Sequence, residues 1–171
     1  MSGIAVVFDE ETISRRITEV GAAIREDAGE REVLLIGILK GASVFLPDLL
    51  RAIPGRVHYE WVNVILGIND TETADATQID FLTQFPIHGY RVYVLKDIVT
   101  TGVIETYLLT QFRDRSPETL RLVALLDCPE SRTVELKCDF PVFSTERGHF
   151  VGYGLESERE LGNLPYIGRI D

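Results

Sequence analysis

The segment Arg91–Thr106 contains residue types that could bind an anion, arranged as a strand, a loop and a helix. Tyr90–Leu95 is a short apolar run rich in β-branched and aromatic residues, which predicts one buried strand. Lys96–Gly102 interrupts this pattern, and from Val103 onward the apolar residues recur at helical spacing. Unpaired backbone N–H groups at the start of a helix, with the positive end of its dipole, bind phosphate well. The loop Thr100–Gly102 is therefore predicted to bind a phosphate, and an ordinary strand-to-helix turn with a threonine cap is the alternative.

The elements that must position this loop are predicted to alternate between strands and helices. Apolar and β-branched runs predict the strands Glu32–Ile38, Val57–Ile65, Arg91–Leu95 and Leu120–Leu126. Apolar residues at helical spacing predict the helices Glu10–Glu26, Ser43–Ile53 and Val103–Arg113. Asp9 is placed to cap the first helix. The alternation predicts an α/β fold with an open, mostly parallel sheet flanked by helices, whose ligands bind beyond the carboxyl ends of the strands.

Other segments do not follow this alternation. Gly67–Asp80 is rich in Asp, Thr and Ala and poor in apolar residues, which predicts a mobile surface loop. Two short β-like runs, Phe140–Phe143 and His149–Tyr153, are followed by the tail Asn163–Gly168. Periodicity leaves the order of these strands open.

Composition limits the classes of protein to consider. A chain of 171 residues with 45% hydrophobic and 26% charged residues is expected to form a single globular domain over 1–171. The formal charge of −10 argues against nucleic acid as a partner, and no apolar run reaches the roughly 20 residues of a membrane span. Cys128 and Cys138 form no CxxC pair, which favours reduced thiols and a cytoplasmic location over a disulfide framework or a zinc site.

The order of these motifs resembles the hypoxanthine-guanine branch of the type I phosphoribosyltransferases. The family's signature is an apolar strand, Glu-Asp, two aliphatic residues and Asp-Thr-Gly-x-Thr, and residues 92–104 read VYVLKDIVTTGVI. Residues 39–41 (LKG) match its pyrophosphate loop, and 151–155 and 163–168 match its C-terminal segments. The resemblance runs from about Phe8 to about Gly168. It implies a type I phosphoribosyltransferase-like fold with a small hood region and a homodimer or homotetramer.

The resemblance also implies a set of ligand contacts for a small phosphorylated molecule or nucleotide. Pyrophosphate would be bound by Leu39, Lys40 and Gly41. The 5′-phosphate and ribose would be bound by Lys96, Asp97, Thr100, Thr101, Gly102, Val103 and Ile104. Asp97 and Thr100 would occupy the catalytic positions, and the base would lie near Cys128, His149 and Phe150. Glu156 stands where the family has an Asp that contacts Mg²⁺, the cofactor expected of an active enzyme.

Several of these positions depart from the family's pattern. Lys96 stands where the family has the first acid of the pair that holds the ribose hydroxyls. Thr100 replaces the Asp that assists proton movement at the purine, and a threonine hydroxyl cannot act as a base near neutral pH. Ile104, Cys128 and Gly162 replace a hydroxyl donor to the 5′-phosphate, a purine-facing lysine and an arginine that contacts pyrophosphate. Because each lost charge-assisted contact costs about 1.5–3 kcal/mol, standard turnover is expected to be very low.

Two more residues bear on the phosphate loop. Glu105 adds a negative charge in the first helical turn, and Lys96 could offset it. Gly102 would let the backbone approach an anion, so a valine there is expected to fill the space of the phosphate.

Each retained group also has a structural alternative. Lys40 and Gly41 could serve only the shape of the turn, Asp97 could cap the helix or pair with Lys96, and Phe150 could belong to the core. His149 could be a surface histidine, Cys128 a small buried residue and Glu156 an acid on a solvated turn.

Intact strands and caps beside a substituted site favour a diverged homologue of hypoxanthine phosphoribosyltransferase. It would bind a phosphorylated ribose or a purine nucleotide, show weak or no standard phosphoribosyl transfer, and be regulatory or repurposed. The alternative is an active purine phosphoribosyltransferase of nucleotide salvage that uses phosphoribosyl pyrophosphate and Mg²⁺. A third hypothesis is a structural subunit that pairs with an active homologue.

Overall fold

The central sheet has six strands in the order β4-β3-β2-β5-β6-β7, and all its neighbouring pairs are parallel except β3 with β4. The computed structural model describes residues 3–65, 78–81 and 85–170. Its sheet strands are β2 (Val33–Leu39), β3 (Val57–Ile65), β4 (Gln78–Phe81), β5 (Arg91–Val99), β6 (Thr119–Asp127) and β7 (Phe140–Ser144). The predicted mostly parallel α/β sheet is confirmed.

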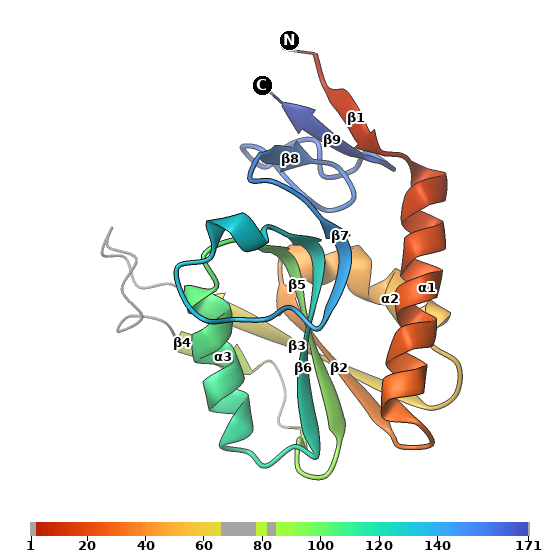
Figure 1. Cartoon of the computed structure of the whole chain (residues 1–171), viewed down its shortest axis with the longest axis vertical. Coiled ribbons are helices and arrows are strands. Elements are labelled where there is room, and N and C mark those ends of the chain that lie inside the picture. Colours follow the sequence, from red (N-terminus) through yellow and green to blue (C-terminus); the bar gives the residue numbers. More distant parts are fainter. Residues whose placement is uncertain (1–2, 66–77, 82–84, 171) are drawn as a thin grey trace.

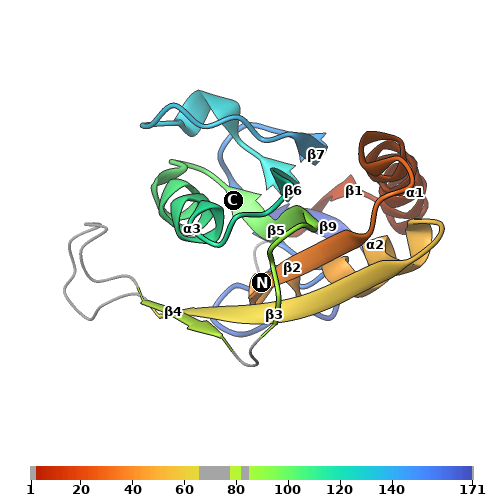
Figure 2. The same cartoon turned by 90° about the horizontal axis from the view of Figure 1, so that it is seen from below.

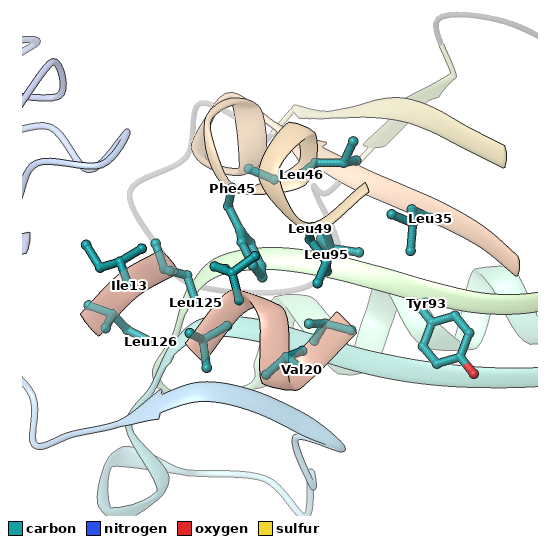
Figure 3. Close-up of a cluster of buried hydrophobic side chains, with 14 of the residues drawn as sticks. Ile13, Val20, Leu35, Phe45, Leu46, Leu49, Tyr93, Leu95, Leu125 and Leu126 are labelled. Carbon is teal, nitrogen blue, oxygen red and sulfur yellow. The ribbon is translucent and has the colours of Figure 1, made fainter. Parts of the chain in front are cut away.

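Helices cover both faces of this sheet (Figures 1 and 2). They are α1 (Glu10–Ala28), α2 (Phe45–Ala52) and α3 (Val103–Arg113). Successive strand residues point to opposite faces, so Leu35 and Leu95 join the core under α1 and α2, whereas Ile36 and Val94 join the core under α3. Figure 3 shows the first core, where Phe45 of α2 lies among the strand and α1 side chains. The continuous apolar runs of the central strands are explained by this burial on both faces.

The helix boundaries follow from local signals. The Asp9 side chain accepts a hydrogen bond from the Thr12 backbone N–H at 2.8 Å, which caps α1 as predicted, and Gly29 follows the last turn. α2 begins at Phe45 rather than near Ser43, because residues Gly41–Ser43 form a separate 3₁₀ turn. This turn directly follows β2 and shapes the predicted pyrophosphate loop.

A second, three-stranded antiparallel sheet forms the predicted hood, in the order β1-β9-β8. Its strands are β1 (Ala5–Phe8), β8 (His149–Val151) and β9 (Ile167–Ile170). It brings the two ends of the chain together above the carboxyl ends of the main sheet (Figure 1). β1 and β9 were not predicted, because a strand of four residues gains its regular hydrogen bonds only from a partner distant in sequence.

Two predictions about the main sheet were wrong. β5 continues to Val99 instead of ending at Leu95, because Ile98 and Val99 still pair with β6. The predicted surface loop Gly67–Asp80 ends in a strand, since Gln78–Phe81 pairs antiparallel with β3. Residues 66–77 lie outside the described residues.

Two further expectations concern the cysteines and the membrane. Cys128 and Cys138 are buried free thiols, as the absence of a CxxC motif predicts. Among the described residues, the helices include none long and apolar enough to cross a membrane.

Candidate functional site

The predicted ligand loops lie at one edge of the sheet. Residues 39–41 begin at the last residue of β2, 100–102 follow β5 and 128–132 follow β6. These three strands are neighbours and run parallel, so their carboxyl ends open toward the same side. The hood extends over this edge, because a Cβ built on Gly154 would lie 3.5 Å from the carbonyl oxygen of Gly41. The fold therefore brings the phosphate, pyrophosphate and hood segments together.

The phosphate loop leaves the start of α3 without a side-chain cap. Gly102 is the N-cap, with a left-handed φ of 84°, and no side-chain cap hydrogen bond forms there. The Thr106 backbone N–H donates to the Gly102 carbonyl oxygen at 2.9 Å, which begins the regular helix. The alternative of a threonine cap is therefore wrong. The first N–H groups of α3 remain suited to bind an anion or water.

Arg132 supports this loop from behind. Its guanidinium donates to the carbonyl oxygens of Val99, at 2.9 Å, and Thr100, and it forms an ion pair with Asp127. The side chains of Arg132 and Asp127 are only 12% and 10% exposed. A further bond runs from the backbone N–H of residue 133 to the carbonyl of residue 101 at 3.0 Å. Sequence reasoning missed Arg132, and the only signal available was a basic residue five positions after an acid that ends an apolar strand.

The wall behind the loop also explains Gly102. A Cβ at this position would lie 3.0 Å from Leu136, 3.1 Å from Val134 and 3.2 Å from Arg132. Glycine is thus favoured by the left-handed backbone and by the packing of residues 132–136. The expectation that a valine would fill the phosphate space is wrong, because a side chain at Gly102 points toward this wall.

Asp97 lies between the two ligand loops. The Lys96 ammonium forms an ion pair with the Asp97 carboxylate, and the two side chains are 21% and 22% exposed. A Cβ built on Gly41 would lie 1.9 Å from Asp97 Oδ2, so the carboxylate rests directly against the backbone of the pyrophosphate loop. The structure therefore shows the alternative in which Asp97 pairs with Lys96, and it also explains why residue 41 is a glycine.

Glu105 is a buried acid behind the same loop. The residue is 5% exposed in the first turn of α3. Burial raises the pKa of this carboxyl, and the nearby Lys96 ammonium opposes that rise most strongly. Asp97 raises the pKa further, while Arg132 lowers it. The positive charge of Lys96 thus acts on both Asp97 and Glu105. This agrees with the prediction that Lys96 offsets the negative charge of Glu105.

The pyrophosphate loop and the hood are joined by a second ion pair. Lys40 Nζ contacts both carboxylate oxygens of Glu156, at 2.6 and 2.8 Å. The Lys40 side chain is 70% exposed and the Glu156 side chain 30%. The candidate cation for pyrophosphate and the candidate acid for Mg²⁺ therefore neutralise each other.

The predicted base-side residues do not gather around one open pocket. Cys128 is 1% exposed and its Sγ lies 3.8 Å from the Glu146 carbonyl oxygen, while burial raises the pKa of the thiol. His149 is exposed, but Phe150, on the opposite side of β8, is 4% exposed within the core. The prediction that Phe150 contacts a base is therefore not supported. The burial of Phe150 supports the alternative that it belongs to the core.

The described residues offer little to a metal ion on their own. They contain no group of three or more His, Cys, Asp or Glu side chains that could hold one. The two candidate carboxylates, Asp97 and Glu156, are each paired with a lysine. Mg²⁺ is commonly bound by one or two carboxylates together with substrate phosphates. The protein groups alone therefore do not fit Mg²⁺, which would have to arrive with a phosphorylated ligand.

The sequence and the fold are similar to those of known proteins. The family model described as "Phosphoribosyl transferase domain" matches residues 6–158. The hypoxanthine-guanine phosphoribosyltransferase of Bacillus subtilis (strain 168) is 32% identical over 163 residues, which cover 95% of this chain and 91% of that protein.

Solved structures give the same result. A hypoxanthine-guanine phosphoribosyltransferase from Bacillus anthracis str. 'Ames Ancestor', with a HEPES molecule in its active site, has a TM-score of 0.90 at 30% identity and covers 97% of this chain and 98% of its own. The hypoxanthine phosphoribosyl transferase of Trypanosoma cruzi has a TM-score of 0.90 at 30% identity, covering 97% of this chain and 90% of its own. Since sequence and backbone agree along nearly the whole chain, this protein belongs to the type I phosphoribosyltransferase family, in its hypoxanthine-guanine branch.

Proposed function

We propose that this chain is a purine phosphoribosyltransferase of low catalytic efficiency. It would transfer the 5-phosphoribosyl group from phosphoribosyl pyrophosphate to N9 of hypoxanthine or guanine, with Mg²⁺ arriving on the pyrophosphate. The substituted positions favour a repurposed homologue, but no observation shows a loss of activity. Two relatives, at 32% and 28% identity, are named hypoxanthine-guanine phosphoribosyltransferases, which supports transfer as the function.

The observation that carries this proposal is the phosphate loop. Gly102 ends the loop in a left-handed conformation, α3 begins without a side-chain cap, and Arg132 holds the loop carbonyls from behind. A 5′-phosphate bound there would accept hydrogen bonds from backbone N–H groups, which substitution of side chains leaves in place. The ribose hydroxyls would then face Asp97.

The low efficiency follows from side chains. Thr100 cannot take a proton near neutral pH, so the acid–base help of a carboxylate, worth about 10²- to 10⁴-fold in rate, is missing. Asp97 is paired with Lys96, so its charge is less available to the ribose. Cys128 is a buried neutral thiol and provides no charged donor to the purine.

The test is a restoration experiment with a matched control. Initial rates are measured with Mg²⁺, phosphoribosyl pyrophosphate and hypoxanthine or guanine, and wild-type kcat is expected below the ordinary enzyme range of about 1–10³ s⁻¹. Thr100→Asp restores a base and should raise kcat by about 10²-fold or more. Thr110→Asp adds the same charge to an exposed position of α3 and should leave kcat unchanged. Undetectable turnover in both wild type and Thr100→Asp would contradict the proposal.

A second candidate function is nucleotide binding without transfer. It is favoured by the two ion pairs that already neutralise the site's lysines, Lys40 with Glu156 and Lys96 with Asp97. Calorimetric titration with inosine 5′-monophosphate separates the two. Binding together with a complete absence of turnover would favour this second function.

Three wider expectations stay predictions. They are a single domain over 1–171, a homodimer or homotetramer, and a cytoplasmic location. Light scattering on the purified protein measures the second of these directly.

A further inference from the structure

The Lys40–Glu156 ion pair joins two loops that are distant in sequence. Lys40 follows β2, Glu156 follows the hood turn, and they are separated by 116 positions. Both oxygens of the carboxylate contact the ammonium, at 2.6 and 2.8 Å. The carboxylate thus occupies up to two of the three N–H donors that Lys40 would otherwise offer to a pyrophosphate group, and it neutralises the charge of the ammonium.

The neighbouring residues are shaped to allow this pair. A Cβ built on Gly162 would lie 2.8 Å from Glu156 Cγ, so a larger residue at 162 would push the glutamate out of its observed position. Gly154 has a φ of +92° and its built Cβ would lie 3.2 Å from the Val44 side chain, which keeps the hood turn close to the loop after β2. Two small residues therefore make room for Glu156 to reach Lys40.

The pair affects the two ends of a ligand differently. A 5′-monophosphate that binds at the start of α3 would leave the Lys40–Glu156 ion pair intact. A pyrophosphate group at residues 39–41 would need Lys40 and would meet the negative charge of Glu156. We infer that Glu156 is a specificity-determining residue that disfavours pyrophosphate-bearing ligands relative to 5′-monophosphates. This inference rests on the proposed function, because that function assigns residues 39–41 to pyrophosphate.

The inference is tested by comparing two affinities in one protein. The dissociation constants of pyrophosphate and of inosine 5′-monophosphate are measured by calorimetry, first with a chelator and then with Mg²⁺. Glu156→Gln should tighten pyrophosphate binding about two- to fivefold, the size expected for releasing an exposed ion pair, and leave the monophosphate constant unchanged. In turnover, the same variant should lower KM for phosphoribosyl pyrophosphate without changing KM for the purine.

Two further variants make the result specific. Gly162→Ala adds a methyl group against Glu156 without changing charge, and it should shift the ratio of the two constants in the same direction. Glu158→Gln removes one acid from an exposed position of the same loop and should leave the ratio unchanged. An equal shift in Glu158→Gln would mean that net charge alone decides, and would overturn the inference.

The other outcomes are also distinct. Weaker pyrophosphate binding by Glu156→Gln in the presence of Mg²⁺ would show that Glu156 helps to hold the metal, and would overturn the inference. An unchanged ratio in both Glu156→Gln and Gly162→Ala would overturn it as well, while the proposed function stands if phosphoribosyl transfer by the wild type is measured. If neither ligand binds the wild type, the proposed function and the inference fail together.

Discussion

The phosphate loop and the pyrophosphate loop are built in different ways. The loop is supported by buried groups, with Arg132 and Asp127 at 12% and 10% exposure behind it. The pyrophosphate side depends on Lys40, at 70% exposure, and on its partner in the hood. A site made from backbone and buried support tolerates changes of exposed side chains, whereas a site made from exposed charges does not. The phosphate-binding part is therefore expected to outlast the transfer chemistry.

The largest expected effect comes from removing the buried support. Arg132→Ala leaves Asp127 as an unpaired buried charge and removes a donor from two loop carbonyls, so the free energy of unfolding should fall by about 3–5 kcal/mol. Arg113→Ala removes an exposed arginine and should change it by less than about 0.5 kcal/mol. Urea denaturation measures both. A loss below about 1 kcal/mol for Arg132→Ala would remove the contrast between the two regions.

A second experiment separates backbone strain from packing at the loop. Gly102 and Gly89 both have positive φ, at +84° and +78°, but only a Cβ at Gly102 meets neighbouring atoms. Backbone strain should cost Gly102→Ala and Gly89→Ala about 1–2 kcal/mol of stability each. Gly102→Ala should lose more in total, because its added methyl group also presses on residues 132–136. Gly102→Ala alone should also weaken inosine 5′-monophosphate binding. Equal losses in the two variants would mean that residues 132–136 do not constrain the loop.

A third experiment concerns the acid buried beside the loop. Burial raises the pKa of Glu105 in the folded protein above its ordinary value of 4.5, so its contribution to stability is present at lower pH and is lost as pH rises through the folded pKa. The stability of wild type relative to Glu105→Gln should therefore fall as pH rises from below 4.5 toward neutral. Chemical denaturation across this range checks the sign.

Lys96 provides a second test of the pH dependence that Glu105 causes. Lys96→Met removes the cation that opposes the raised pKa, and the decline with pH should become steeper. The two substitutions should also be coupled by about 0.5–3 kcal/mol in a double-mutant cycle. A coupling near zero would place Glu105 outside the influence of the site.

The smallest expected effect is on the exposed side. Lys40→Met should change the free energy of unfolding by no more than about 1 kcal/mol, because exposed ion pairs contribute little to stability. It should nevertheless weaken pyrophosphate binding. A stability loss as large as that of Arg132→Ala would show that the two loops are stabilised in the same way.

Much of the fold was determined by local sequence. Apolar runs place β2, β3 and β6 within one or two residues of their observed ends, and the apolar spacing from Val103 to Arg113 coincides with α3. Asp9 caps α1 because its side chain needs only an N–H three residues away. The positions of the ligand loops after β2 and β5 follow from the same alternation. These features depend on residues close together in the chain, which is why periodicity and capping rules find them.

Tertiary structure decided the rest. The hood depends on β1 pairing with β9 from the opposite end of the chain, and β5 reaches Val99 only because β6 lies beside it. The role of Arg132, the burial of Phe150 and the pairing of Lys40 with Glu156 all involve contacts between separate elements. A residue's type gives its possible partners, but its neighbours are set by the packing of the sheet, the helices and the hood. The same sequence motif thus encodes the strand-to-helix turn locally, while its charges are balanced only in the folded protein.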